Sequence, residues 1–139
     1  MHQIAYKEGY KYQIVEPYSI QINIKPNANI GTSSDFISLS KEGLLTLKTG
    51  YAWDGPSGLE IDTLNFMRSS LVHDALYQLM REGKLDKNTY RQPADQLLCS
   101  MGREDGVSAL RAYWVYYAIR LLGDKGASPR GARTVIHAP

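Results

Sequence analysis

Hydrophobic and polar residues alternate along the first third of the chain, which is the pattern of half-buried β-strands. β-Branched and aromatic residues alternate with polar ones in YKYQIV, YSIQINI, SDFISLS and LLTLKTGYAW, between residues 10 and 53. Turn-forming residues separate these segments at 16–17 and 25–29, and residues 41–43 have the composition of a tight hairpin connection. The alternation predicts four or five short strands that form a small antiparallel sheet.

Beyond residue 64 the apolar positions recur with the period of α-helices. A first helix is predicted over residues 64–81, with Gly83 as its stop. The second helix is predicted to have Pro93 in its first turn and to end near Met101, and the third to end at Gly123.

Strands followed by helices define an α+β fold, in which a three-helix unit follows the sheet. We predict one domain over residues 1–123, with strands in 1–53 and helices in 64–123. The tail DKGASPRGARTVIHAP has no period, so residues 124–139 are predicted to be extended or disordered.

Composition narrows the class of protein. The 139 residues are 43% hydrophobic, which is enough for one buried core. A formal net charge of +2 is too small to indicate nucleic acid or an anionic membrane as an obligatory partner. Cys99 is the only cysteine, so an internal disulfide is excluded. We find no signal-peptide pattern and no apolar run of about twenty residues, and therefore expect a soluble protein.

The third helix is rich in aromatic residues. Its rings are those of Tyr113, Trp114, Tyr116 and Tyr117. We expect them in the core, and the alternative is a contact with lipid or with another protein. Its two arginines, Arg111 and Arg120, are expected at solvated edges of the helix.

Polar residues interrupt the apolar pattern of the first helix. His73 and Tyr77 are four residues apart and share one face, while Asp74 points about 100° away around the axis. A short connection makes the first two helices antiparallel neighbours, so that Asp95 can reach His73 or Tyr77. An aspartate that accepts from an imidazole leaves the other ring nitrogen as a base for hydrolysis by water. The alternative is that these residues only lock two helices together.

The segment GYAWDGPSG, residues 50–58, precedes the first helix. Its glycines allow backbone carbonyls to converge on a hard cation, with Asp74 as a carboxylate from the helix. We therefore predict a Ca²⁺ site formed by Asp74 and by loop residues: Tyr51, Trp53, Asp54 and Gly55. The alternative for Asp54 is an ordinary turn.

These motifs resemble a known superfamily. HDALY at 73–77, GK at 83–84 and PADQ at 93–96 are similar to the His-Asp-x-x-Tyr helix and its partners in the phospholipase A2 superfamily, most closely the viral capsid-borne branch. The resemblance covers roughly residues 51–99. It implies that His73 is a general base and that Asp95 is the carboxylate that orients it. It also implies that the Tyr77 hydroxyl bonds to Asp95 and that Asp74 binds calcium.

A second resemblance covers more of the chain. The pattern WDGPS…VHDALY…AD is similar to a family of unknown function that is common in bacterial and phage genomes. The phospholipase loop normally reads Tyr-x-Gly-x-Gly, and Trp53 stands at the position of its first glycine.

Two functions are therefore expected. The first is a calcium-dependent, phospholipase A2-like ester hydrolase, phage- or prophage-encoded, with phospholipid or a membrane surface as its partner. The second is a non-catalytic phage virion or accessory protein that binds a phage structural or host protein. Both imply a location in the host cytoplasm or on the virion. A metal phosphohydrolase would need further histidines around the His-Asp doublet, and only His2 precedes it.

Overall fold

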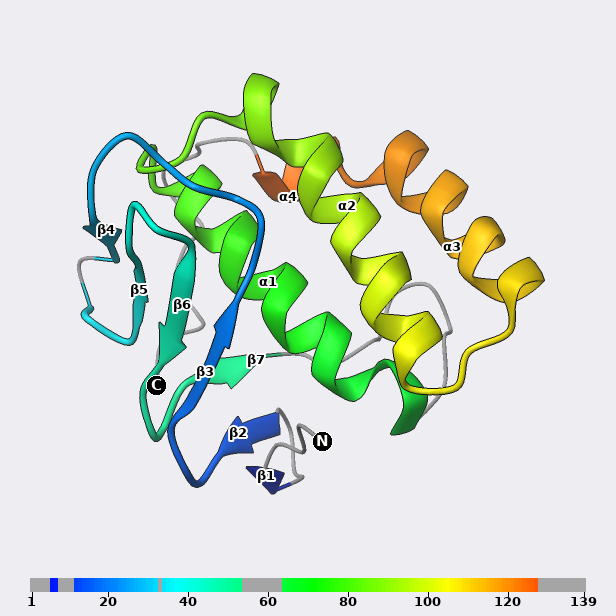
Figure 1. Cartoon of the computed structure of the whole chain (residues 1–139), viewed down its shortest axis with the longest axis horizontal. Coiled ribbons are helices and arrows are strands. Elements are labelled where there is room, and N and C mark those ends of the chain that lie inside the picture. Colours follow the sequence, from blue (N-terminus) through cyan, green and yellow to red (C-terminus); the bar gives the residue numbers. More distant parts are fainter. Residues whose placement is uncertain (1–5, 8–11, 33, 54–63, 128–139) are drawn as a thin grey trace.

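A computed structural model of the chain describes residues 6–7, 12–32, 34–53 and 64–127 (Figure 1). Within these ranges short strands come first and helices follow, so the predicted α+β class is confirmed. In chain order the elements are β1 (Tyr6–Lys7), β2 (Tyr12–Ile14), β3 (Tyr18–Gln21), β4 (Ile30–Gly31), β5 (Ile37–Leu39), β6 (Leu44–Leu47), β7 (Ala52–Trp53), the 3-10 turn η1 (Leu64–Phe66), α1 (Met67–Arg81), α2 (Lys87–Glu104), α3 (Ala109–Leu122) and α4 (Asp124–Ala127).

The strands form two antiparallel sheets rather than the single sheet that the alternation predicts. One has the order β3-β6-β5-β4 and the other the order β1-β2-β7. In the first sheet Ser38 pairs with Thr46 and Leu39 with Leu45, and the two leucines are fully buried. Alternate residues therefore face the core, as the period of two requires. The predicted hairpin connection is confirmed, since Gly43 has a φ of 94° between β5 and β6.

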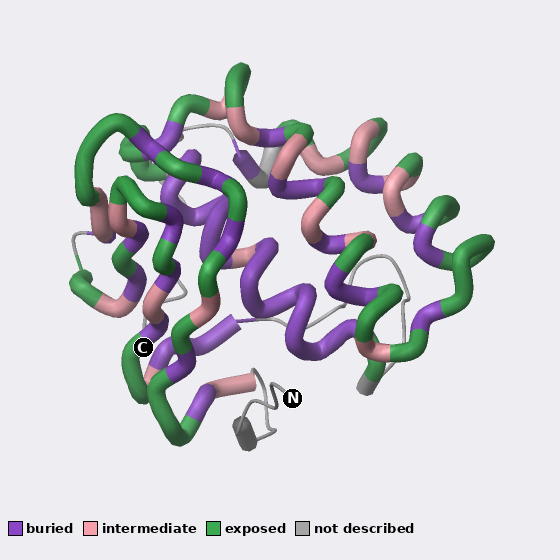
Figure 2. The backbone as a smooth tube through the Cα atoms, viewed as in Figure 1, coloured by how far each residue is buried: buried purple, intermediate pink, exposed green. Residues whose placement is uncertain are grey.

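Helix α1 is the central element of the fold. Figure 1 shows it between the strands and α2, and Figure 2 shows that it is buried along most of its length. Leu71 and Leu76 are fully buried and belong to the same apolar cluster as Ile37 and Leu45 of the sheet. The other helices continue outward, with α2 packed on α1 and α3 packed on α2.

The helix boundaries follow from local caps. Gly83, with a φ of 76°, lies just beyond α1, as predicted. Asp86 caps α2 by accepting a hydrogen bond from the backbone N–H of Thr89. Because this cap starts the helix at Lys87, Pro93 lies inside α2, and its prediction in the first turn was wrong.

The segment after α3 was predicted incorrectly in part. Residues 124–127 form the short helix α4 rather than an extended tail, and Ala127 is fully buried. Helix α4 packs on α1. This tertiary contact stabilises a helix that is too short to form on its own, and the local sequence pattern does not contain it. The remaining part of the tail, 128–139, lies outside the described residues.

The aromatic band of α3 is a second correction. Tyr113, Trp114 and Tyr117 are exposed, whereas Val115 and Ile119 are buried. The reason is that α3 packs on α2 through one narrow face, so the opposite face has no neighbour among the described elements.

Among the helices of the described ranges, none combines the length and the hydropathy that a membrane-spanning helix needs.

Candidate functional site

His73, Tyr77 and Asp95 meet between α1 and α2. His73 Nε2 lies 2.7 Å from Asp95 Oδ1, and the Tyr77 hydroxyl donates to the same oxygen at 2.6 Å. The four-residue spacing places both donors on the face of α1 that contacts α2. The predicted contact between these two helices is confirmed.

Asp95 is buried completely, yet it is surrounded by donors. Arg120 from α3 donates to Asp95 Oδ2 at 2.8 Å, and Arg91 Nε lies 4.0 Å from that oxygen. Burial alone would raise the pKa of Asp95, but hydrogen bonds from His73, Tyr77 and Arg120 outweigh it and hold this pKa below its usual value. Asp95 is therefore an ionised carboxylate at neutral pH.

The charge of Asp95 determines how the His73 ring is protonated. An ionised carboxylate only accepts hydrogen bonds, so Nε2 carries the proton and donates it. In a neutral ring the lone pair then lies on Nδ1. The described residues make their contact with this ring at Nε2, and no fully buried polar side-chain atom among them lacks a partner, so Nδ1 lies at the exposed part of the ring. The His73 side chain keeps 10% of its surface exposed. This is the arrangement of an oriented base.

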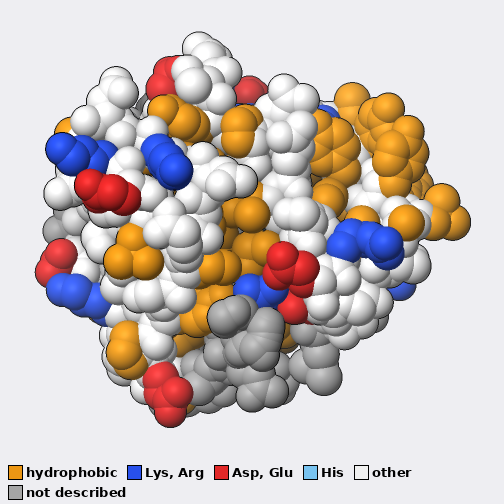
Figure 3. All heavy atoms as spheres, in the orientation of Figure 1, with side chains coloured by type: hydrophobic (Ala, Val, Ile, Leu, Met, Phe, Trp, Pro, Cys, Tyr) orange, Lys and Arg blue, Asp and Glu red, His pale blue; other side chains and the backbone are white. Residues whose placement is uncertain are grey.

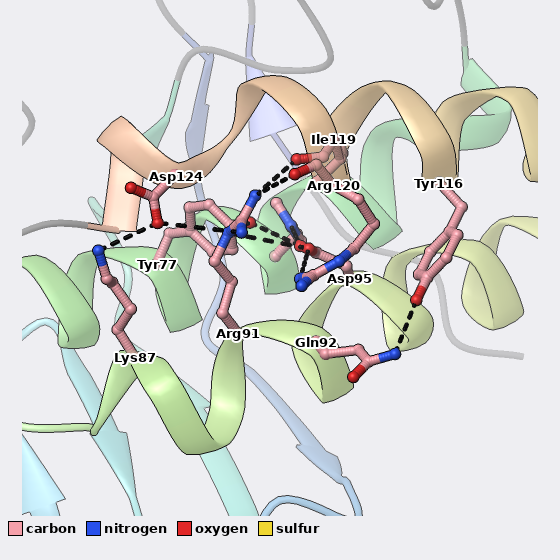
Figure 4. A network of polar contacts seen from close by, with 10 residues as sticks. Tyr77, Lys87, Arg91, Gln92, Asp95, Tyr116, Ile119, Arg120 and Asp124 are labelled. Carbon is pink, nitrogen blue, oxygen red and sulfur yellow. Dashed lines mark hydrogen bonds and ion pairs between the residues drawn. The ribbon is translucent and has the colours of Figure 1, made fainter.

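Arg91 holds the tyrosine and the end of α3 (Figure 4). Its Nε donates to the Tyr77 hydroxyl at 3.1 Å, and its Nη2 donates to the carbonyl oxygen of Ile119 at 2.8 Å. Burial and the nearby Asp95 charge raise the pKa of Tyr77, so the hydroxyl keeps its proton and donates it. Farther out, Lys87 and Asp124 form an ion pair with 3.0 Å between Nζ and Oδ1.

Tyr51 and Trp53 lie in the core between the strands and α1. The Tyr51 carbonyl accepts from the backbone N–H of Ile14, and its hydroxyl donates to Gln78 Oε1 at 3.3 Å. Trp53 is buried in β7 and donates its indole N–H to Ser70 Oγ at 3.1 Å. The role of both residues as calcium ligands stays a prediction.

The other predicted calcium ligands are only partly described. Asp74 is half-buried on α1, while Asp54 and Gly55 lie outside the described residues. The described ranges contain no cluster of three His, Cys, Asp or Glu side chains that could hold a metal ion. Calcium binding by the predicted ligands thus stays a prediction: Asp74, Tyr51, Trp53, Asp54 and Gly55.

Two arginines of the site were missed by the sequence analysis. Arg91 precedes Asp95 by four residues on one helix, and this spacing could have indicated an ion pair. Arg120 was expected at a solvated edge, but its side chain is 30% exposed and paired with Asp95. No spacing rule indicates that contact, because it joins two helices across their packing interface.

Comparison of the chain with protein-family models, curated proteins and solved structures found no match. The resemblance to the phospholipase A2 superfamily therefore stays a prediction, and the functional argument depends on the geometry of the site.

Proposed function

We propose that the chain hydrolyses a carboxylic ester, with His73 as the general base, Asp95 as its orienting carboxylate and Tyr77 as a positioning residue. The observation that carries the proposal is the contact of His73 Nε2 with the buried, ionised Asp95, which leaves Nδ1 available. The Tyr77 hydroxyl and Arg120 fix the carboxylate from two further sides.

The reaction follows from this geometry. His73 Nδ1 takes a proton from a water molecule while the water oxygen attacks the ester carbonyl carbon. The tetrahedral intermediate collapses when the single bond between the former carbonyl carbon and the alkoxy oxygen of the ester breaks. The imidazolium returns its proton to the leaving alkoxide. The products are a carboxylic acid, which ionises, and an alcohol. The buried negative charge of Asp95 stabilises the imidazolium that forms in between.

Phospholipid as the substrate and calcium as the cofactor enter the proposal from the sequence resemblance. Asp74 is the carboxylate that would bind the ion, and with few carboxylates its affinity would be modest, roughly 10⁻⁴ to 10⁻³ M in Kd. Bound calcium would supply a positive charge for a developing oxyanion. Calorimetry on wild type and Asp74→Asn tests this part, and equal heats would remove calcium from the proposal.

Fatty-acid release from mixed phospholipid vesicles tests the reaction, measured with and without millimolar calcium. His73→Gln is expected to lower the rate by about 10²- to 10⁴-fold, because glutamine can still donate to Asp95 but provides no base. Asp95→Asn is expected to cost less, since the base itself remains. Asp35→Asn is the matched control, because Asp35 pairs with Lys48 at the exposed surface of the strand region.

Two outcomes would contradict the proposal. One is that purified, folded wild-type protein releases no fatty acid under any condition, and the other is that His73→Gln retains the wild-type rate. The melting temperature of each variant shows whether a lost rate reflects lost structure.

A second candidate function is a non-catalytic phage virion or accessory protein that binds a phage structural or host protein. The contacts of Asp95 fit its non-catalytic part, since donors from α1 and α3 converge on one carboxylate of α2. Such a network also serves to join three helices. In that case His73→Gln would alter stability, and there would be no hydrolytic rate to lose.

A further inference from the structure

Helix α3 presents a large apolar face that no described element covers. The exposed fractions of its residues range from 46% to 78%, and the face is defined here as Leu110, Tyr113, Trp114, Tyr117, Leu121 and Leu122. Figure 3 shows hydrophobic side chains gathered at this edge of the molecule. Elsewhere among the described residues, Val15 and Leu44 are the exposed large hydrophobics, and both lie in the strand region. A continuous apolar face of this kind marks an interaction surface.

The residue types on this face fit the boundary between lipid headgroups and acyl chains. Tyrosine and tryptophan combine an apolar ring with a polar atom, and both are enriched at that boundary. Tyr113 and Tyr117 pack edge to face with ring centroids 4.9 Å apart, so these rings project together rather than separately. Leucines at both ends of the face extend the apolar surface along the whole helix.

The charge of α3 favours an anionic surface over a second copy of the chain. Arg111 is exposed and the helix contains no acidic residue, while Arg120 is paired with Asp95 on the packed side. A symmetric pair would place the same face and its basic edge against itself. An anionic membrane instead offers negative headgroups to Arg111 and acyl chains to the apolar residues.

We infer that the outer face of α3 binds the surface of an anionic phospholipid bilayer. The helix lies flat on the membrane. On the side of α3 that faces away from the membrane, Arg120 Nη1 donates to Asp95 Oδ2 at 2.8 Å. The inference rests on the proposed function for its choice of lipid, but binding can be measured without hydrolysis.

The two tryptophans provide a direct readout. Trp114 is 68% exposed on the face, whereas Trp53 is 1% exposed and hydrogen-bonded to Ser70. Insertion should therefore shift the emission of Trp114 to shorter wavelength and leave that of Trp53 unchanged. The probe is a sonicated vesicle of phosphatidylcholine with phosphatidylglycerol, compared with phosphatidylcholine alone, with His73→Gln as the protein so that the lipid stays intact.

The variants separate the face from other exposed hydrophobic residues. The double change of Trp114→Ser and Leu121→Ser is expected to lower vesicle binding by tenfold or more, measured by co-sedimentation. Arg111→Gln should reduce the preference for anionic vesicles by about fivefold. Leu44→Ser on β6 is the matched control, because it removes an exposed leucine away from α3 and should leave binding unchanged.

Several results would overturn the inference. One is that vesicles leave the emission of Trp114 unchanged, and another is that the double variant still co-sediments with vesicles. A third is a blue shift that depends only on protein concentration, which would assign the face to self-association. An unchanged melting temperature of the double variant shows that the face, and not the fold, was altered. Binding by the wild-type protein without any fatty-acid release would contradict only the proposed hydrolysis.

Discussion

Asp95 is the residue on which the candidate site depends. Its carboxylate is buried, and it accepts from His73, Tyr77 and Arg120, which belong to two other helices. Removal of one member leaves buried charges or donors without partners, which costs more than the net value of a single contact. The same residue thus contributes to stability and to the orientation of the base.

Asp95 is expected to make stability depend on pH in the acid range. Since its pKa is lower in the folded chain than its usual value of about 3.9, its stabilising contribution is fully present above that value. The contribution is lost as the pH falls through the lower, folded-state pKa. Asp95→Asn should reduce the free energy of unfolding by about 3–5 kcal/mol at pH 7, and the difference from wild type should shrink below about pH 4.

Urea unfolding of both proteins at pH 7, 5, 4 and 3 measures this difference. Asp35→Asn serves as the control, because Asp35 and Lys48 are largely exposed and such pairs contribute little. A constant difference between wild type and Asp95→Asn down to pH 3 would contradict the assignment of Asp95 as the ionised acceptor.

At the scale of elements, the junction between α3 and α4 is tied to the site. Gly123 ends α3, and its backbone N–H donates to the carbonyl oxygen of Ile119 at 2.8 Å. Arg91 donates to the same carbonyl and to that of Arg120. The carbonyls at the end of α3 are therefore satisfied by an arginine of α2, which also contacts Tyr77.

Gly123→Ala is expected to disturb this junction. A Cβ at this position would lie 2.8 Å from the Ile119 oxygen, 3.0 Å from the Tyr77 hydroxyl and 3.3 Å from Arg91 Nη2. Because the first of these is backbone, the helix end must shift, and a loss of about 1–3 kcal/mol in the free energy of unfolding is expected. Urea unfolding measures the loss.

Gly83→Ala provides a comparison at another helix end. A Cβ there meets nothing within 4 Å, but the φ of 76° is unfavourable for alanine. Gly83→Ala should therefore lower stability while leaving the rate of ester hydrolysis intact, whereas Gly123→Ala should lower both. Equal rates in the two variants would contradict the link between the α3 end and the site.

At the scale of the whole molecule, sheets and helices share one core. The largest apolar cluster includes Leu45 and Trp53 from strands together with Leu71 and Leu76 from α1. Polar contacts cross the same boundary, since Arg68 of α1 donates to the Tyr18 hydroxyl at 3.2 Å. Neither part can lose its structure without exposing apolar surface of the other.

Unfolding is therefore expected to be a single cooperative transition. In Trp114→Phe, the remaining tryptophan is Trp53, whose ring packs between β7 and α1. Its fluorescence and the far-ultraviolet circular dichroism of the helices should have the same denaturant midpoint. A fluorescence transition at lower denaturant than the helical one would show that the strands unfold separately.

Local features of the fold could be predicted from the sequence. The change from a period of two to the helical period separated strands from helices, and Gly83 marked the end of α1. His73 and Tyr77 could be placed on one helix face because their spacing fixes the angle between them. The short connection after Gly83 then brought Asp95 within reach, since short connections favour antiparallel packing of neighbouring helices.

Which helix faces meet and which stay uncovered depends on how distant elements pack, and the sequence patterns did not predict it. Whether Arg120 points to solvent or to Asp95 depends on how α3 packs against α2, and no local pattern contains that rotation. The same packing leaves Trp114 exposed, while the pairing of β2 with β7 directs Trp53 into the core. Local periods fix the direction of a side chain relative to its own element, but burial and charge pairing depend on the neighbouring element, which is distant in sequence.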